Sequence, residues 1–585
     1  MKRLCLLCLA FLLASQTAFA EGPSSALSLY GNPKYSEHFT HFEYVNPQAP
    51  KGGKLTLPTF GTFDTFNSFI LNGQAAPGSD LLFSTLMTAS LDEPFSMYGL
   101  VAEAVKVEPD QVTFYLNPRA KFHDGTRIVA DDVVFSFNIL KEKGAPQYRV
   151  YYADVEDVRA LSDTQVRFYL RKGAHNKELP LILGQTPVLS KTYFKDKDFL
   201  TASLDVPVGS GPYKVKEFEP NRFVSYQRDA DYWGADLPSQ KGFYNFDEIR
   251  YDVYRDTTVA VEAFTSGLFD VRFENEAKKW ATAYDIPAVS EGRIIKKEFE
   301  HHLPSGVQGF VFNTRRPLFS DKRVRQALSL VFDFNWTNRH LFYGAYKRMN
   351  SFFENSDLAA PDKVGEAEKP LLEAFHVDPQ GYELPDYPAG QMRPAFEKAL
   401  SLLEQAGWTV REGRLVNEKG QPFEFEILLD ASGAAAWERI TLPFIHNLKR
   451  IGIEAHIRTM DVLQYKTRLE QFDYDMIVTI WGQSLSPGNE QAYFWGSRAA
   501  NEKGGYNFAG IQEERVDALI ARLIQAQTRE ELRTIVHVLD RVLLQGYYVI
   551  LHWFSPVQRV LYWDKFGMPE QVPLQGISLL TWWAK

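Results

Sequence analysis

The sequence predicts an α/β fold for a chain long enough to form about three domains. Segments in which apolar and polar residues alternate, typical of strands, take turns with segments whose apolar residues recur at helical spacing. The chain has 585 residues, and a domain usually contains about 100–200 of them. Beyond its N-terminal leader, the sequence has no stretch apolar enough to cross a membrane and no short tandem repeat.

Alternation with a period of two predicts the strands in the first half of the chain. An opening strand at residues 54–59 follows the turn Lys51-Gly52-Gly53, and two more are expected at residues 111–116 and 164–170. Each of the latter two places apolar side chains on one face, as a half-buried strand does. These side chains are Val112, Phe114, Leu116, Val166, Phe168 and Leu170.

Start and stop signals predict three helices. Ser320 is expected to cap the first, and Asp256 the second, which runs to Gly267. Pro394 opens the third helix, which ends at Gly407. Apolar residues at helical spacing give the first and third helices a buried face. They are Val324, Ala327, Leu328, Val331 and Phe332 in the first, and Phe396, Ala399, Leu400 and Leu403 in the third.

Two long segments are predicted as loops. Residues 355–393 are interrupted by Pro, Gly and acidic residues, and residues 485–507 are rich in Gly, Ser and Asn. Loops of this length are usually functional or disordered.

The N-terminus has the pattern of a secretory signal peptide. Lys2 and Arg3 precede an apolar stretch at residues 4–13, and Ala18-Phe19-Ala20 offers a cleavage site after Ala20. A membrane anchor is the alternative, but the apolar stretch is shorter than the roughly 20 residues that a spanning helix needs. We therefore expect a Sec-exported, periplasmic protein.

Cysteine usage and charge exclude several classes of site. Both cysteines, Cys5 and Cys8, lie within the leader and too early for a lipoprotein signal. The exported chain would have no disulfide, thiolate nucleophile or Cys-ligated metal. The formal net charge of −9 argues against nucleic acid, whose binding proteins need a basic surface. Aromatic residues make up 14% of the chain, which fits either a large core or an amphipathic ligand cavity.

No catalytic motif stands out. The sequence lacks Gly-x-Ser-x-Gly, His-Glu-x-x-His and the Walker loop. His301 and His302 are adjacent, so on a strand they point to opposite faces and cannot ligate one ion without a bend. We expect no catalytic residue, no metal and no cofactor. A secreted hydrolase and a periplasmic chaperone-like role remain as alternatives.

A series of motifs resembles the family 5 extracellular solute-binding proteins, the peptide- and nickel-binding receptors of ABC importers. The resemblance covers nearly the whole chain after the leader, and the order of the motifs makes it specific. The motifs lie at residues 112–126, 130–135, 209–213, 231–234, 249–270, 312–313, 321–328, 399–408 and 451–453. Residues 30–31, 42–53, 301–313 and 480–489 further resemble the binding subunit of the Yej-type importer, which takes up microcin C and oligopeptides.

The resemblance implies a two-lobed periplasmic binding protein fold of the large three-domain peptide-receptor type. Lobe one would be discontinuous, formed by residues 21–64, 201–300 and 553–585, with a small domain inserted at residues 65–200. Lobe two would span residues 301–552, and residues 1–20 would be the signal peptide. The ligand would lie in the cleft between the lobes, and an inner-membrane ABC permease would receive it from a monomeric protein. A nickel chelate is the alternative ligand.

The same resemblance implies where the ligand binds. Residues Trp481, Gly482, Gln483, Ser484 and Leu485 would contact the peptide backbone, although a plain core role is the alternative for Trp481. Many relatives place an Asp three residues after this Trp, where it pairs with the free amino group of the peptide. Ser484 occupies that position here, which predicts tolerance of a blocked N-terminus.

Further binding residues are expected on both lobes. Asp64 and Asn67 follow the opening strand and would face the cleft, unless they only cap their own turn. Arg315, beside Asn313 near a lobe crossing, would pair with an anionic ligand group or with a surface carboxylate. Tyr98, Phe494 and Trp495 are additional candidates for the pocket.

Overall fold

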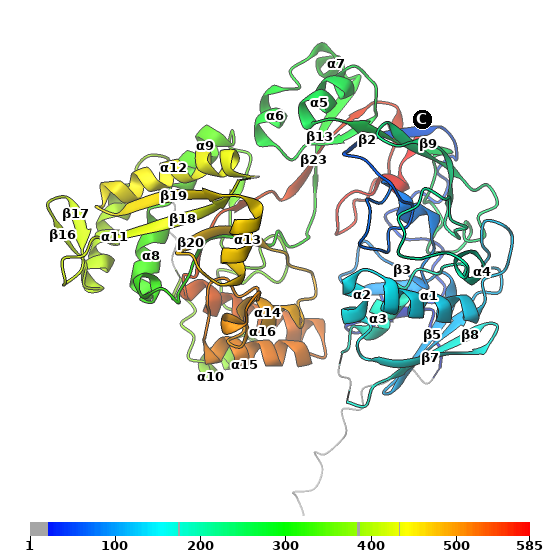
Figure 1. The fold of residues 1–585 in the computed structure, drawn as a ribbon, viewed down its shortest axis with the longest axis horizontal. Coiled ribbons are helices and arrows are strands. Elements are labelled where there is room, and N and C mark those ends of the chain that lie inside the picture. Colours follow the sequence, from blue (N-terminus) through cyan, green and yellow to red (C-terminus); the bar gives the residue numbers. More distant parts are fainter. Residues whose placement is uncertain (1–21, 174–175, 383–386, 432) are drawn as a thin grey trace, which may run out of the picture. The chain divides into compact units, whose positions relative to one another are not determined.

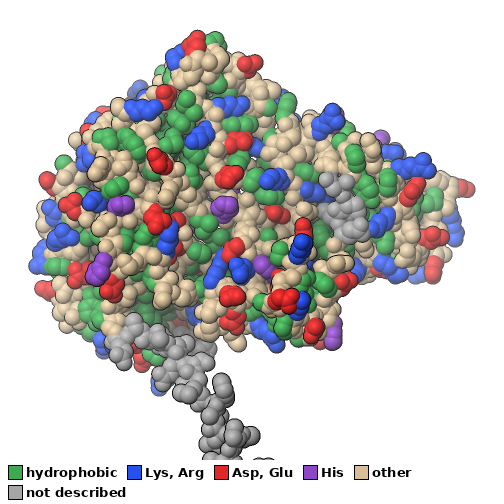
Figure 2. Space-filling view, turned by 180° about the vertical axis from the view of Figure 1, so that it is seen from behind, with side chains coloured by type: hydrophobic (Ala, Val, Ile, Leu, Met, Phe, Trp, Pro, Cys, Tyr) green, Lys and Arg blue, Asp and Glu red, His purple; other side chains and the backbone are tan. Residues whose placement is uncertain are grey.

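The computed structural model describes residues 22–173, 176–382, 387–431 and 433–585. The predicted signal peptide, its cleavage site and both cysteines lie outside these residues. Among the described residues, no helix is both long and apolar enough to span a bilayer. In the face that Figure 2 shows, acidic and basic side chains are interspersed.

The chain divides into two compact units. Unit 1 comprises Met1–Ala260, Phe566–Pro569 and Leu580–Lys585, and unit 2 comprises Val261–Lys565 and Glu570–Leu579. Residues 261–300, which the resemblance assigns to lobe one, are grouped with unit 2. The lobe boundaries themselves stay a prediction.

Unit 1 contains a four-stranded sheet in the order β2-β11-β10-β9, in which β2 and β11 are parallel and the other pairs antiparallel (Figure 1). Leu55 of β2 is 1% exposed and Ile249 of β11 is likewise buried, so this face belongs to the core. The strand predicted at residues 54–59 is confirmed. The strands are β2 (Lys54–Phe60), β9 (Tyr213–Glu219), β10 (Phe223–Arg228) and β11 (Glu248–Tyr254).

A second, antiparallel sheet of unit 1 has the order β5-β6-β8-β7 and packs against α1. Phe137 of α1 contacts Phe168, which in turn contacts Phe114, with ring centroids 5.3 and 5.7 Å apart. The strands predicted at residues 111–116 and 164–170 are confirmed within one residue. The elements are β5 (Ala102–Glu108), β6 (Gln111–Leu116), α1 (Ala130–Lys143), β7 (Val155–Ser162) and β8 (Gln165–Leu170).

Short elements complete unit 1. A small sheet has the order β1-β4-β3. The short helix α2 comes before β7 in the sequence, and α3 and α4 come between β8 and β9. The bounds of these short elements are β1 (Ala26–Ser28), β3 (Met87–Ala89), β4 (Ser96–Gly99), α2 (Pro146–Tyr151), α3 (Leu179–Gly184), α4 (Lys191–Phe194), β24 (Phe566–Gly567) and β25 (Trp583–Ala584).

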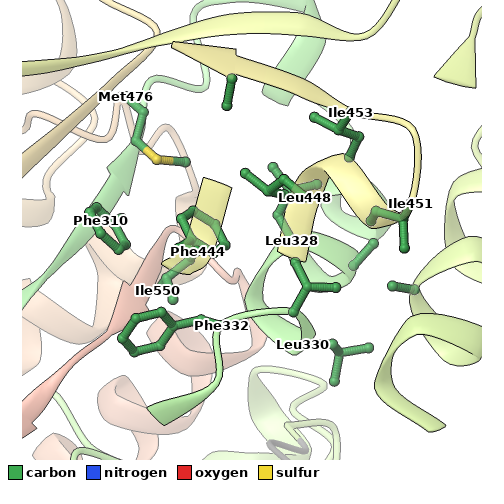
Figure 3. Close-up of a cluster of buried hydrophobic side chains, with 14 of the residues drawn as sticks. Phe310, Leu328, Leu330, Phe332, Phe444, Leu448, Ile451, Ile453, Met476 and Ile550 are labelled. Atoms are coloured by element: carbon green, nitrogen blue, oxygen red, sulfur yellow. The ribbon is translucent and has the colours of Figure 1, made fainter. Parts of the chain in front are cut away.

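Unit 2 is built on a five-stranded mixed sheet in the order β19-β18-β20-β14-β21. A large core lies between this sheet and α8, α11 and α12, where Phe444 stacks on Phe310 with centroids 5.1 Å apart (Figure 3). The elements are β14 (Val307–Phe312), α8 (Lys322–Leu330), α11 (Arg393–Gln405), β18 (Glu424–Asp430), α12 (Ala434–Arg450), β19 (Glu454–Met460), β20 (Met476–Trp481) and β21 (Val549–Leu551).

The other elements of unit 2 include a three-stranded sheet in the order β12-β23-β13 and a pair of helices, α15 and α16. The helix α5 (Thr257–Thr265) begins in unit 1 and ends in unit 2. The other elements are β12 (Val271–Phe273), α6 (Ala277–Thr282), α7 (Pro287–Ser290), β13 (Ile294–Glu300), α9 (Phe334–Leu341), β15 (Lys347–Arg348), α10 (Lys369–Ala374), β16 (Thr409–Arg411), β17 (Arg414–Val416), α13 (Val462–Glu470), α14 (Glu490–Trp495), α15 (Glu514–Gln525), α16 (Arg529–Gln545), β22 (Trp553–Phe554) and β23 (Val557–Trp563).

The predicted helix ends are confirmed except for one cap. The Asp256 carboxylate accepts the amides of Thr258 and Val259 at 2.9 Å, and Gly267 adopts a φ of 78° after α5. The prediction that Ser320 caps α8 is wrong. Its hydroxyl donates to Pro317 O at 2.8 Å, whereas Asp321 accepts the amide of Arg323 at 2.8 Å and is the cap.

The third predicted helix and the predicted loops are confirmed in part. Pro394 lies in the first turn of α11, and Gly407 follows its end with a φ of 88°. The two long loops, however, contain the short helices α10 and α14. Pro and Gly in these segments limit the length of the helices without preventing them.

Asp540 is a fully buried carboxylate on α16 that holds residues 351–360 against that helix. It accepts hydrogen bonds from the Ser351 hydroxyl at 2.6 Å and from the amides of Phe352 and Ala360 at 2.8 and 2.9 Å. Burial raises the pKa of Asp540 to about 6, although the three hydrogen bonds act in the opposite direction.

The raised pKa of Asp540 predicts a pH-dependent stability. The folded state binds the proton more tightly than the unfolded state, whose pKa is 3.8. The contribution is therefore present below pH 3.8 and lost as the pH rises through about 6, amounting to about 3 kcal/mol. Chemical denaturation between pH 4 and pH 8 should show this difference between wild type and Asp540→Asn. Parallel curves for the two proteins would contradict it.

Candidate ligand-binding site

Two hydrogen bonds define which way the backbone of β20 faces. The amide of Asn313, directly after β14, donates to Asp475 O before β20 at 3.0 Å, whereas the amide of Phe312 donates to Tyr548 O before β21 at 3.1 Å. Backbone groups of successive strand residues point to alternate sides. With the register of β14 on β20, the amide and carbonyl of Ile480 therefore point away from β14.

β18 covers that far side of β20 only in part. The described ladder between β18 and β20 extends no further than the pair Leu428–Ile477. Ile480 lies beyond this point with its side chain 60% exposed, and Gly482 is exposed as well. We call Ile480–Gly482 the open edge. Such an edge is a template for an extended chain, which pairs through main-chain hydrogen bonds.

Trp481 anchors the open edge from the opposite face of the sheet. Its indole N–H donates to Tyr506 O at 2.9 Å, and its ring packs against Trp495 and Phe508 with centroids 4.8 and 5.7 Å away. Gly306 lies beside it at a φ of 72°, where a Cβ would come within 2.5 Å of the Trp481 carbonyl. Trp481 is 2% exposed, so its side chain belongs to the core of unit 2. Its backbone forms part of the open edge.

A network of side-chain amides holds the loop after Trp481. Gln491 donates to Gln483 at 2.7 Å and accepts the indole N–H of Trp495 at 2.9 Å. The Ser484 hydroxyl accepts the amide of Ser486 at 3.2 Å. Gln483 and Ser484 are half-buried, so this loop presents amide and hydroxyl groups. At its end the Glu490 carboxylate accepts the amide of Gly488 at 2.9 Å and the side-chain amide of Gln491 at 3.0 Å.

Arg529, the first residue of α16, supports this loop from behind. Its guanidinium donates to the carbonyl of Leu485 and, through a second nitrogen, to the Asp357 carboxylate at 2.6 Å. Leu485 itself is buried. Because the guanidinium is a rigid fork, it fixes the Leu485 carbonyl relative to residue 357.

Replacing Arg529 with Lys is expected to loosen the loop. A lysine ammonium is a point donor and cannot reproduce both bonds of the fork. We expect faster amide exchange at residues 482–489 and about threefold to tenfold weaker ligand binding, since one hydrogen bond is worth about 1 kcal/mol. Hydrogen exchange and calorimetry measure these effects. Arg533→Lys, one turn further along α16 and exposed, is the control, and equal effects of both variants would contradict this role.

Known proteins share both the sequence and this fold. The model of the bacterial extracellular solute-binding proteins, family 5, matches residues 96–503. The chain is a family 5 extracellular solute-binding protein. It is 40% identical over 592 residues to the uncharacterized protein YejA of Escherichia coli, covering 99% of this chain and 97% of that protein. The predicted family and its Yej-type branch are confirmed.

Two further similarities bear on this solute-binding protein. The peptidoglycan-binding protein YepA of Agrobacterium fabrum is 37% identical over 598 residues, covering 98% of this chain and 96% of that protein. The oligopeptide-binding protein AppA of Bacillus subtilis, solved with a nonapeptide, superposes with a TM-score of 0.63 at 20% identity, covering 92% of this chain and all of that chain. The periplasmic binding protein fold is thereby confirmed.

Asn313 and Arg315 of the solute-binding protein make hydrogen bonds within unit 2. The Asn313 amide donates to the carbonyls of Phe472 and Tyr474 at 2.9 and 2.8 Å. The Arg315 guanidinium donates to main-chain carbonyls and packs 3.8 Å from the centroid of the Phe472 ring. These acceptors are the carbonyls of Ala500, Asn507 and Phe508. Burial lowers the pKa of Arg315, and its donors are engaged internally.

The aromatic candidates differ in exposure. Phe494 is half-buried, whereas Trp495 is 0% exposed beneath Trp481. Tyr98 of unit 1 is 1% exposed, donates to Glu93 at 2.5 Å and accepts the amide of Tyr35 at 3.1 Å. Tyr98 and Trp495 thus contribute to the cores of their units, and their role in ligand binding stays a prediction.

Asp64 and Asn67 shape the loop that follows β2. The Asp64 carboxylate accepts the amide of Gln74 at 2.6 Å, a bond that spans ten residues and closes the loop without capping the turn of Asp64 itself. The Asn67 side chain donates to Phe199 O at 3.0 Å and accepts the amide of Phe69 at 3.1 Å. Asp64 is exposed and Asn67 half-buried, so this loop is accessible at the surface of unit 1.

Metal ligation finds no support in the described parts of the chain, where no group of three or more His, Cys, Asp and Glu could hold an ion. Nδ1 of His301 lies 3.2 Å from the side-chain amide of Asn355. This contact ties the strand end to the following segment.

The predicted site residues did not include three residues that form the open edge or support the loop after it. Ile480 reads as a buried strand residue, since it follows Ile477 and Val478 in an apolar run. The sequence does not show that Gly306 needs a positive φ, because any glycine can adopt one. Arg529 follows an N-cap Thr and looks like an ordinary surface residue of α16.

Proposed function

We propose that this chain is the periplasmic substrate-binding subunit of an ABC importer and that it captures oligopeptides or peptide conjugates. The open edge at Ile480–Gly482 supports the proposal. Exposed main-chain amide and carbonyl groups bind any extended peptide without reading its sequence. The exposed glycine lets a second backbone approach closely, since nothing lies within 4 Å of where a Cβ would be.

The transport cycle follows from this role. The leader directs export and is cleaved after Ala20, and the ligand binds in the interlobe cleft that the family resemblance predicts. Binding stabilises the closed state, which a monomeric protein presents to the inner-membrane permease. The protein catalyses no reaction in this cycle.

The ligand is proposed to have a blocked N-terminus in at least some cases. Ser484 offers a hydroxyl, already accepting the amide of Ser486, where many relatives offer a carboxylate to the free amine. A blocked amine has no charge to pair, so it gains nothing from that carboxylate. The name of YepA points the same way, because the peptides of peptidoglycan are attached through their N-termini. Microcin C-like conjugates belong to the proposed class.

Native mass spectrometry of the purified protein tests this proposal directly. A peptide-class ligand recovered intact at about one per chain would support it, and its mass would show whether its N-terminus is blocked. Fragments and turnover would instead indicate a hydrolase, and binding of unfolded protein a chaperone. Titration with matched free and formylated peptides then measures the preference, and a strong preference for the free amine would contradict the blocked-terminus part.

Ile480→Pro tests the edge itself. Proline removes the amide of Ile480, which points away from β14, so the ladder with β14 stays complete while a main-chain bond to the ligand is lost. We expect about tenfold weaker peptide binding, with the far-UV circular dichroism unchanged. Ile480→Val keeps the amide and is the control. Wild-type affinity in the proline variant would show that the ligand binds elsewhere.

A further inference from the structure

Unit 1 contains a pocket of about 240 Å³ that lies apart from the open edge in the sequence. One wall is the loop after β2, with Thr65, Phe66 and Asn67, and the other is the segment from Tyr193 to Pro207. Small-molecule sites usually measure about 300–1,000 Å³, so this pocket suits a compound with a single ring.

Hydrogen bonds join the two walls and fix their relative positions. The amide of Phe66 donates to Ser203 O at 3.2 Å, and the Asn67 side chain donates to Phe199 O at 3.0 Å. Asn67 therefore holds the wall and is not free to bind a ligand.

The lining of the pocket combines aromatic rings with a charged rim. Phe66, Phe194 and Phe199 form its apolar part, with Phe194 and Phe199 in edge contact at 5.4 Å between centroids. Tyr193 is half-buried at the rim. Aromatic side chains of this kind bind a ring through edge or stacked contacts.

The charges at the rim are unequal. Lys197 pairs with Asp205 at 2.9 Å and lies 4.4 Å from the centroid of the Tyr193 ring. Asp198 accepts the Thr201 hydroxyl at 2.8 Å and the amide of Leu200 at 3.2 Å. These bonds lower the pKa of Asp198, so the carboxylate is ionised at neutral pH. Lys197 and Asp205 offset each other, whereas Asp198 accepts its hydrogen bonds from neutral groups and interacts with the charge of Lys143, which also lowers its pKa.

We infer that this pocket binds a small aromatic amine, with the ring among the phenylalanines and the ammonium group beside Asp198. The site is independent of the function proposed above, since it uses only unit 1 residues. A carboxylate on the same ring would meet Asp198 as a like charge, and a neutral alcohol would gain no ion pair. The order of affinity should be amine, then alcohol, then carboxylate.

Ligand-observed NMR on the purified full chain tests the inference with 2-phenylethylamine, 2-phenylethanol and phenylacetate at pH 7. We expect the amine to bind about threefold to fivefold more tightly than the alcohol, as an exposed ion pair allows. Asp198→Asn should abolish this difference. Asp196→Asn, which removes an 85% exposed carboxylate outside the pocket lining, should preserve it.

Thr201→Trp provides a second test, because Thr201 is exposed at the rim and a bulky side chain there should block entry of all three compounds. Equal affinity for amine and alcohol in the wild type, or equal effects of the two Asp variants, would overturn the charge assignment. Unchanged binding in Thr201→Trp would overturn the location.

Discussion

Replacing Ser484 with Asp is expected to give this solute-binding protein a strong preference for peptides with a free N-terminus. The new carboxylate would stand where many relatives carry one, and a charge-assisted hydrogen bond contributes about 1.5–3 kcal/mol. The ratio of affinities for free and formylated peptides should rise about 10- to 100-fold over the wild type. Calorimetric titration with a matched peptide pair measures both affinities.

Ser484→Asn is the control for this experiment. It has the size of the Asp variant and can still accept a hydrogen bond, but it carries no charge. If Asn shifts the ratio as far as Asp does, size and not charge is responsible. A wild-type protein that already rejects formylated peptides would contradict the expected role of Ser484.

Replacing Glu368 with Ala is expected to lower the free energy of unfolding by about 3–5 kcal/mol, the cost of breaking a buried ion pair from one side. Glu368 is 3% exposed, with its two oxygens 3.2 Å from Nδ1 of His537 and Nε of Arg541. His537 and Arg541 are also buried. Removing the Glu368 carboxylate leaves the buried Arg541 guanidinium without the carboxylate that pairs with it. Urea denaturation at pH 7 measures the change.

Glu366→Ala is the matched control, two residues away. Its carboxylate pairs with Lys369 but is 87% exposed, so its loss should cost less than about 1 kcal/mol. Changing Glu368 and Arg541 together to Leu should cost less than the two single changes added, because no buried charge is left over. Additive effects would show that the pair is not coupled.

Hydrogen bonds also connect the buried cluster of Glu368, His537 and Arg541 to the loop after Trp481. Nε2 of His537 contacts Asp357 O at 3.0 Å, and the Asp357 side chain pairs with Arg529, which holds the Leu485 carbonyl. Residues far apart in the chain thus meet on α16. The stability of this helix and the shape of the proposed site depend on the same segment, residues 351–361.

Local sequence patterns predicted a helix or strand well where one feature, such as a turn or an alternation of apolar residues, is clear. The turn at residues 51–53 located β2, and alternation located β6 and β8, whose apolar residues Val112, Phe114, Val166 and Phe168 are all buried. The cap of α8 was missed by one residue, since Ser320 and Asp321 are both good caps and the turn at Pro317 engages the Ser320 hydroxyl. The helix α14 was missed because its six residues lie in a segment rich in turn formers.

The sequence predicted which segment contains the candidate site, but not how the side chains of that segment are oriented. The motif located Trp481 and the residues after it, yet it could not show that the Trp481 indole points into the core while Ile480 is exposed. The side chains of Asn313, Arg315 and Trp495 look equally suitable for binding in the sequence. Their partners, such as Ala500 and Phe472, come from other parts of the chain and are not encoded in local patterns.

The sequence by itself determined the family and the α/β class, because ordered motifs and periodicities are properties of the chain alone. Only the tertiary structure decided which backbone groups are available to a ligand. In the described part of the chain β18 pairs with β20 as far as Ile477, and this depends on the register of strands that are remote in sequence. The open edge at Ile480–Gly482 and the pocket beside Asp198 exist because long-range packing left them uncovered.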